Sequence, residues 1–255
     1  MQLPNPIRRL PFKCEDGTLN TANLQIVPMT QSLVEIWMQN VQPIVNAEYQ
    51  HSAPDVDEKL VRADVNWDWN QYFSFHRLGN AIERTTMIGA NFAPTIALCL
   101  VVETLEGDLF PVGMLIAHRS FKCTVRKVKR RRLFTWYLAD APSEIYGGAL
   151  LPEQPRLQGV AKALIDTSIQ ISLASGFGGE ILLHACEKGG AKLIKFYRDG
   201  CRMIQLDSSD PIISFFRANQ ARDRFFYMDI ECAAEFSRMS DVYREDTEAS
   251  AVAQV

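Results

Sequence analysis

Hydrophobic residues in the first third of the chain recur mainly at helical spacing. Leu33, Val34, Trp37 and Val41 would lie on one side of a helix predicted over residues 31–41. A short apolar run before this helix predicts a strand, and a longer polar and aromatic stretch after it predicts one or two more helices. These elements are expected over residues 23–29 and 57–84.

The middle of the chain changes to a pattern that is typical of strands. The segments "PTIALCLVVET" (94–104) and "FPVGMLIAHRSF" (110–121) are rich in β-branched residues, and a Glu-Gly-Asp turn lies between them. This combination predicts an antiparallel hairpin. A third strand, "RLFTWYLA" (132–139), is expected to follow it.

The second half alternates helices and strands. A helix is predicted from about residue 160 to 175, and "GEILLHACE" (179–187) is apolar throughout, as in a strand buried on both faces. A short helix that ends at a glycine is expected over residues 189–200. The remaining predicted elements are a strand, a short helix and a strand, over residues 201–206, 210–220 and 224–230. The order predicts a mixed α+β sheet within one domain.

Composition adds the class of protein and its expected surroundings. The 255 residues are 47% hydrophobic and 22% charged, which is typical of a globular protein with a sizeable core. No apolar segment follows the basic start, so no secretory signal is expected, and the apolar run 92–102 is too short to span a membrane. The six cysteines form no C-x-x-C pair. We expect a reducing, cytoplasmic setting with neither disulfides nor a structural metal.

One segment stands apart by charge. "RKVKRRR" (126–132) carries six positive charges, although the whole chain has a net charge of −3. Such a run predicts a solvated loop or strand edge, and the other interpretation is contact with nucleic acid or an acidic partner.

The stretch "RLQGVAKALI" (156–165) is the main candidate for binding chemistry. A helix N-terminus presents unpaired N–H groups and a partial positive charge, so it attracts phosphate. Gly159 would let a ligand approach the backbone, Ala161 would avoid a clash, and Arg156 could add a charged hydrogen bond. Alone, this pattern is also compatible with an ordinary helix start.

Its neighbours give the stretch a context. A strand precedes it, a buried strand follows, and "KFYRDG" (195–200) comes after that strand. Over residues 133–201 the chain resembles the GCN5-related N-acetyltransferase (GNAT) superfamily, in which a [Q/R]-x-x-G-x-[G/A] loop grips the pyrophosphate of acetyl-CoA. Two positions depart from the family pattern: Gly190 stands where many members have asparagine, and Cys201 where phenylalanine is usual.

The resemblance implies a GNAT-like acyl-CoA N-acyltransferase fold, with a central, mostly antiparallel sheet flanked by helices. It implies acetyl-CoA as acyl donor and direct attack by an amine acceptor, which could be a small molecule, a protein or an aminoacyl-RNA. It divides the chain into an N-terminal extension, a single acyltransferase domain, and a C-terminal helix with a flexible tail. These parts are expected over residues 1–21, 22–230 and 231–255.

The resemblance also assigns roles to residues. Tyr197 matches the general acid that protonates the CoA thiolate, and Asp140 and Glu144 are candidates for the base. The residues expected to bind the donor belong to one strand and to the loop with its helix start: Tyr137, Leu138, Arg156, Leu157, Gln158, Gly159, Val160, Ala161 and Lys162. The alternative function is a catalytically silent GNAT-fold binding module whose stretch 126–132 docks on nucleic acid or an acidic protein.

Other polar and aromatic side chains favour structural roles. Glu103, His118 and His184 are further candidates for the base, but a histidine within an apolar strand is typical of a core position. The pair His184 and Cys186 is expected to be a buried strand pair, and Trp67 to pack in the core or to form the wall of a cleft.

Overall fold

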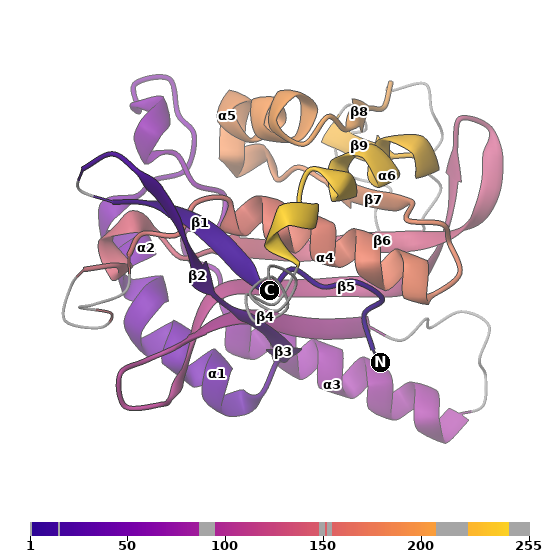
Figure 1. The fold of residues 1–255 in the computed structure, drawn as a ribbon. Helices are drawn as coiled ribbons and strands as arrows, with labels where there is room; N and C mark the ends of the chain where they lie inside the picture. Colours follow the sequence, from indigo (N-terminus) through magenta and orange to yellow (C-terminus); the bar gives the residue numbers. More distant parts are fainter. Residues whose placement is uncertain are drawn as a thin grey trace, which may run out of the picture.

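The protein is built around one twisted sheet with helices on both faces (Figure 1). The computed structural model describes residues 2–14, 16–86, 95–147, 151, 155–207 and 224–244. Within these, the main sheet has seven strands in the order β3-β4-β5-β6-β7-β9-β8. They are β3 (Gln25–Pro28), β4 (Thr95–Glu103), β5 (Leu109–Val125), β6 (Val128–Asp140), β7 (Ile181–His184), β8 (Ile204–Gln205) and β9 (Phe225–Met228). Only β6 and β7 pair in parallel.

The described residues contain six α-helices and several shorter helical turns. They are α1 (Gln31–Ile36), α2 (Gln42–Glu48), α3 (Trp69–Thr86), α4 (Val160–Ala174), α5 (Gly190–Lys195) and α6 (Ile230–Arg238). A π-helical turn (Trp37–Val41) joins α1 to α2, and another (Phe196–Gly200) extends α5. Single 3-10 turns lie at Glu58–Leu60, Ser143–Ile145, Glu187–Gly189 and Asp241–Tyr243.

Register shows which helix covers which face of the sheet. Gly113 pairs with Asp140, and a Cβ on Gly113 would lie 3.1 Å from Val160, so this face is covered by α4. Met114 points to the opposite face, because neighbouring strand residues alternate. Tyr137 shares this opposite face and stacks on Tyr72 of α3. Helices α3 and α4 therefore lie on opposite faces of β5 and β6.

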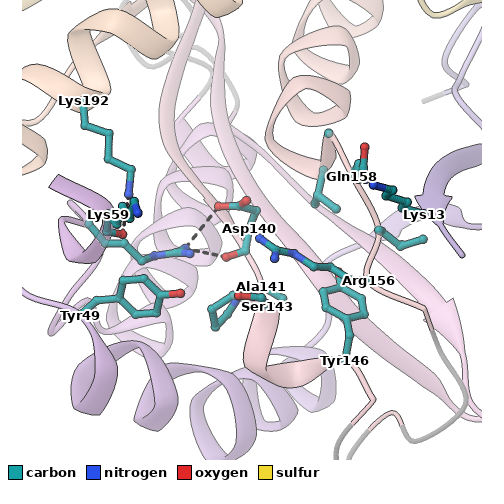
Figure 2. Close-up of a pocket in the computed structure, with 15 residues that line it drawn as sticks. Lys13, Tyr49, Lys59, Asp140, Ala141, Ser143, Tyr146, Arg156, Gln158 and Lys192 are labelled. Carbon is teal, nitrogen blue, oxygen red and sulfur yellow. Dashed lines mark hydrogen bonds and ion pairs between the residues drawn. The ribbon is translucent and has the colours of Figure 1, made fainter. Parts of the chain in front are cut away.

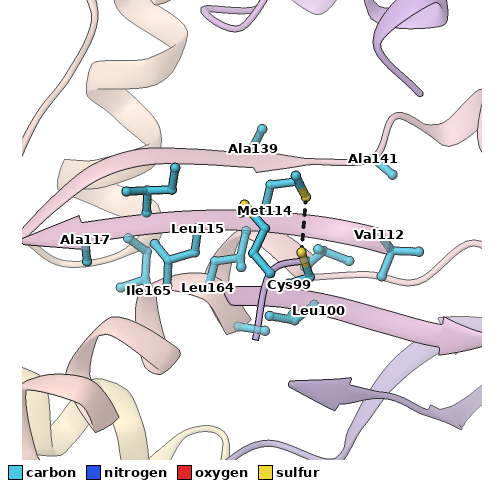
Figure 3. Packing of buried hydrophobic residues seen from close by; sticks show 14 of the residues in the cluster. Cys99, Leu100, Val112, Met114, Leu115, Ala117, Ala139, Ala141, Leu164 and Ile165 are labelled. Atoms are coloured by element: carbon cyan, nitrogen blue, oxygen red, sulfur yellow. Dashed lines mark hydrogen bonds between the residues drawn. The ribbon is translucent and has the colours of Figure 1, made fainter. Parts of the chain in front are cut away.

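The core between these layers combines aliphatic side chains with large aromatic ones such as Trp37 and Trp69. Figure 3 shows Cys99 of β4 beside Met114 of β5, with their sulfur atoms 3.4 Å apart, and Leu164 and Ile165 of α4 beneath the strands. The Cys99 thiol is fully buried, which raises its pKa far above the usual value for cysteine. It acts here as a small apolar residue.

Strand β6 carries an irregularity that shapes the groove described below. Tyr137 pairs with Ile116 and Thr135 pairs with Ala117, so Trp136 is an extra residue on β6. Such a bulge bends the strand and redirects its side chains. Strand β7 pairs with β6 only from Leu133 to Thr135, and the remainder of β6, to Asp140, runs on without a partner strand on that side among the described residues.

Both ends of the described chain are fastened to α4. Asn5 donates its N–H to the Gln170 side chain over 3.0 Å. Arg244 binds both carboxylate oxygens of the buried Asp166, at 2.7 and 2.9 Å, and also binds the Asn5 carbonyl. The Ser237 hydroxyl of α6 donates to Asp166 as well. The first and last segments thus close over the middle of this helix.

A two-stranded hairpin precedes the main sheet and was not predicted. It pairs β1 (Arg9–Lys13) with β2 (Leu19–Asn23), so the expected boundary between residues 21 and 22 falls inside β2. Phe12 bridges to Leu157, and Gln158 donates its N–H to the Pro11 carbonyl over 2.8 Å. The hairpin therefore holds the loop that leads into α4.

Most of the predicted elements are present, with different ends. The fold class, the hairpin of β4 and β5 and the helix ending near residue 175 are confirmed. The predicted strand ends near 121 and 132 are wrong, because β5 and β6 continue to a tight turn at Arg126 and Lys127. The buried strand is shorter than predicted, residues 181–184, and His184 and Cys186 are only half-buried. The predicted helix 210–220 and the expected C-terminal tail lie outside the described residues.

Candidate active site

A cationic cavity of 710 Å³ opens where β6 ends and α4 begins (Figure 2). Its lining combines residues from the N-terminal hairpin, the end of β6, the loop before α4 and helix α5. Five of these residues are cationic: Lys13, Lys59, Arg62, Arg156 and Lys192. Asp140 is the one carboxylate in the described lining. This balance of charges suits a ligand with several negative charges.

The start of α4 forms one wall of this cavity. Gly159 is the N-cap residue, its φ of +81° lies in the left-handed region, and no side chain caps the helix. The N–H groups of the first turn are therefore open to a ligand, at the positive end of a 15-residue helix. Gln158 is different, because its N–H is already bound to Pro11.

A buried hydroxyl also lacks a partner in this cavity. The Tyr146 oxygen is shielded from solvent and has no hydrogen bond among the described residues. Burial, together with the nearby Asp140 carboxylate, raises the pKa of Tyr146, so the group stays an O–H donor at neutral pH. An unsatisfied buried donor costs stability unless a ligand accepts its hydrogen bond. The cavity thus fits a ligand that offers phosphate oxygens.

Asp140 stands at the inner end of the cavity, in a network with Arg62. The Arg62 guanidinium contacts the Asp140 carboxylate at 3.3 Å and its carbonyl at 2.6 Å, and it also binds Asp64. Burial works to lower the pKa of Arg62, but the two carboxylates outweigh it and hold that pKa above its usual range. Arg62 therefore stays charged and fixes the position of Asp140.

Two further cavities continue from this point along β6. A cavity of 250 Å³ shares Arg62, Asp140 and Lys192 with the cationic cavity. A third, of 410 Å³, shares Leu138 and Tyr197 with the second. The three form a chain of neighbouring cavities that passes through the gap where β7 leaves β6. A long ligand lying along this groove would reach from the α4 N-terminus to Tyr197.

Tyr197 lies at the centre of the groove. It is 7% exposed and lines both inner cavities. The π-helical turn that carries it is closed by the Cys201 N–H, which donates to the Phe196 carbonyl over 2.9 Å, and such turns are frequent at functional sites. Burial raises the pKa of Tyr197 above 10.0, so its phenol is protonated at neutral pH.

The structure brings most of the expected donor-binding residues to this groove. The stretch from Arg156 to Val160 lines the cationic cavity, and Ala161 lines the second one. Leu138 borders both inner cavities, and Tyr137 borders the third. Lys162 is exposed and borders none of these cavities.

The expected bases are placed differently from one another. Asp140 borders the groove, whereas Glu144 is exposed and receives hydrogen bonds from the Tyr49 hydroxyl at 3.1 and 3.2 Å. His118 lies against the Trp136 ring, outside the three cavities. His184 lines the 410 Å³ cavity, as does Cys186, although the sequence favoured a buried structural pair.

Sequence reasoning missed several lining residues. Lys13 reaches the cavity through the hairpin contact with Leu157, for which no local signal exists. Arg62 and Lys192 come from segments that the alternation of apolar and polar residues places only roughly. The one available signal is their positive charge. Arg62 lies within "KLVRAD" (59–64), and Lys192 follows the glycine pair at 189–190.

The basic run is only partly a free surface. Arg126 and Lys127 form the exposed turn between β5 and β6. Arg130 pairs with the buried Glu180, and Arg132 is buried, with its Nε 3.8 Å from the same carboxylate. Two of the six charges therefore stabilise the fold, which weakens the interpretation of the run as a docking surface.

Comparison with known proteins gives distant matches only. No protein-family model and no curated protein matches the chain. A solved structure of a KacTA–DNA complex matches at 12% identity with a TM-score of 0.42, covering 85% of this chain and 99% of that one.

Two structures of a tyrosine-to-phenylalanine mutant of the AtaT toxin, bound to the C-terminus of the antitoxin AtaR, also match at 13% identity. The one that also contains acetyl-CoA has a TM-score of 0.41 and covers 85% of this chain and 97% of that one. The other has a TM-score of 0.42, with coverage of 88% and 100%. These TM-scores are below 0.5, so the matches do not identify a function for this chain.

No helix among the described residues is long and apolar enough to cross a membrane. All six cysteines have free thiols. The described residues contain no group of three side chains of the metal-binding kinds placed to hold a metal ion.

Proposed function

We propose that the protein is an N-acyltransferase that moves an acetyl group from acetyl-CoA to an amine. The observation that carries this proposal is the row of three neighbouring cavities, which runs from a cationic cavity at a helix N-terminus to a buried tyrosine at the gap between β6 and β7. The resemblance of residues 133–201 to the GNAT superfamily supports the same assignment.

Different parts of the groove suit the charged part and the uncharged part of the donor. The open N–H groups of α4, with Arg156 and Tyr146, would bind the pyrophosphate. The narrower second cavity, lined by Leu138, Leu193 and other residues, would take the uncharged pantetheine arm. Beyond Thr135, no strand among the described residues pairs with this side of β6, and the backbone groups there would bind the arm and the thioester carbonyl.

The reaction is a direct transfer. The amine nitrogen attacks the thioester carbonyl carbon, a C–N bond forms, and the electron pair moves onto the carbonyl oxygen. When this intermediate collapses, the C–S bond breaks and the sulfur leaves as a thiolate. Tyr197 gives its phenolic proton to this thiolate, and the amine proton passes through water to Asp140, which lines the neighbouring 250 Å³ cavity.

The surroundings of Tyr197 and Asp140 support their roles as proton donor and proton acceptor. Burial raises the pKa of Tyr197, so its phenol carries its proton at neutral pH and can donate it when the thiolate leaves. Asp140 is held by Arg62 at the junction of the first two cavities, so it is a fixed acceptor close to the groove.

Calorimetric titration with acetyl-CoA tests the donor site. We expect binding by the native protein, and binding weakened at least about 10-fold in Arg156→Gln, because one charge-assisted hydrogen bond is worth about 1.5–3 kcal/mol. Arg238→Gln is the matched control, since this exposed arginine lies on α6, away from the groove. Absence of binding by the native protein at saturating acetyl-CoA would refute the proposal.

Release of free CoA, followed with a thiol reagent, tests the general acid. Tyr197→Phe should keep its affinity for acetyl-CoA and lose most of its turnover, about 100-fold, which is the usual size of a general-acid contribution. Full turnover by this variant would remove Tyr197 from that role.

A further inference from the structure

We infer that the 410 Å³ cavity receives the acceptor, and that this acceptor is an amine with an aromatic ring close to the reacting nitrogen. The inference rests on the proposed function and identifies the substrate class of the same site. Its support is the position of the cavity and the rings that form its wall.

The 410 Å³ cavity lies across the sheet from the entrance to the donor groove. Asp140, at the entrance to the donor groove, lies on the face of the sheet covered by α4, and Tyr137 lies on the face covered by α3. The cavity lined by Tyr137 meets the donor groove at Leu138 and Tyr197. An amine in this cavity would approach the thioester from the other side of the sheet.

The wall of this cavity is unusually aromatic. Tyr137 stacks on Tyr72 with ring centres 3.9 Å apart, and Trp136 stacks on Tyr137 at 5.6 Å, with angles of 10° and 12° between the planes. Consecutive strand residues normally point to opposite faces. The bulge at Trp136 allows these two rings to lie together.

A third ring completes the wall. Trp67 meets Tyr137 edge-on, with centres 5.4 Å apart and planes at 82°. It also meets Trp69, which is fully buried and fixes its position from behind. The wall is therefore rigid before a ligand arrives, so binding costs little side-chain entropy. Trp136 is 36% exposed, so part of its ring surface is accessible to a ligand.

The charged residues that line this cavity limit the class of amine that it can bind. Glu187 is the one carboxylate and Lys188 the one ammonium among the described residues of this lining, and both are exposed at its rim. A single carboxylate matches one ammonium group. A polyamine would have further charges facing rings and Lys188, whereas an aromatic ring would make edge and face contacts with the wall.

An amine panel with acetyl-CoA tests the inference. 2-Phenylethylamine and 2-cyclohexylethylamine have the same length and nearly the same size, and only the first has a π system. We expect kcat/KM to be about 10-fold higher for phenylethylamine, the upper range of aromatic pair energies, and spermidine to be a poorer acceptor than either.

Variants connect this preference to the wall. Trp136→Leu should reduce the preference for the aromatic amine to less than about 3-fold, and Phe75→Leu, an exposed α3 ring outside the cavity, should leave it unchanged. Quenching of tryptophan fluorescence by phenylethylamine, measured with CoA bound, gives a readout of binding that does not depend on turnover.

The outcomes separate the two proposals. If acetyl-CoA does not bind, the proposed function is wrong. If acetyl-CoA binds and cyclohexylethylamine or spermidine is the equal or better acceptor, or if none of the three amines reacts, the aromatic acceptor is wrong and the donor site stands. A preference that survives Trp136→Leu contradicts the role given to the wall.

Discussion

Two glycines at opposite ends of α4 provide a matched test of the donor site. Gly159 begins the helix with φ +81°, and Gly176 follows its C-terminal end with φ +78°. A Cβ added at either position would have no heavy atom within 4 Å, so alanine causes backbone strain and no collision. Only Gly159 lines the cationic cavity.

The strain predicts equal losses of stability. Forcing alanine into the left-handed region costs about 1–2 kcal/mol, which corresponds to a fall in melting temperature of about 2–8 °C in a protein of this size. Both Gly159→Ala and Gly176→Ala should show this fall in differential scanning calorimetry.

Binding should distinguish the two variants. The methyl group at position 159 would occupy the space in which a phosphate oxygen meets the open N–H groups of α4. Losing one such contact weakens acetyl-CoA binding by about 10-fold or more, while Gly176→Ala should bind as the native protein does. Calorimetric titration measures both affinities. Equal affinities in the two variants would falsify the assignment of this helix N-terminus to the donor.

Three further predictions concern charges and one concerns pH. Asp166→Ala should lower the unfolding free energy by about 3–5 kcal/mol, because it removes the buried carboxylate that binds Arg244 and leaves this guanidinium the exposed Asp241 as its ion-pair partner; urea denaturation measures it, and a loss below 1 kcal/mol contradicts the role of this pair. Lys13→Gln should weaken acetyl-CoA binding several-fold at low salt and less at high salt, since this exposed charge is screened; an unchanged affinity at low salt removes Lys13 from the site. Arg132→Met should destabilise the protein in the same denaturation assay, because it removes a cation from beside the buried carboxylate of Glu180. Native stability in this variant would contradict the structural role given to Arg132. Burial raises the pKa of Tyr197, so this acid stays protonated up to its folded pKa, and kcat should show no loss from its ionisation below about pH 10; a limb that begins near pH 8 and disappears in Tyr197→Phe would contradict this.

The sequence indicates which local segments line the candidate site. The loop from Arg156 to Ala161 is recognisable because a helix start depends on a few adjacent residues: a glycine in the left-handed region, a small residue and an apolar run. Tyr197 is assigned through the resemblance of "KFYRDG" to the family pattern, and the structure places it in the lining of two cavities. The order of strands followed from alternation and from the turn between β4 and β5.

What the sequence did not predict depends on contacts between distant segments. Nothing local in "RLPFK" indicates that Phe12 pairs with Leu157, or that Lys13 reaches the donor cavity. The bulge at Trp136 is likewise invisible, since its signal is a register with β5 and not a residue type. The charge of the basic run does not show that Arg132 is buried. Its position depends on Glu180, a buried carboxylate from a distant segment that lies beside it.

The closure of α4 by two distant segments makes one helix serve both the donor site and the joining of those segments. Asp166 and Gln170 receive their partners from Asn5 on one side and from Arg244 and Ser237 on the other. Loss of Arg244 would leave the buried Asp166 carboxylate without its closest cation, on the same helix whose N-terminus lines the cationic cavity. Changes in the first or last described segment can therefore reach the donor site without touching any residue that lines it.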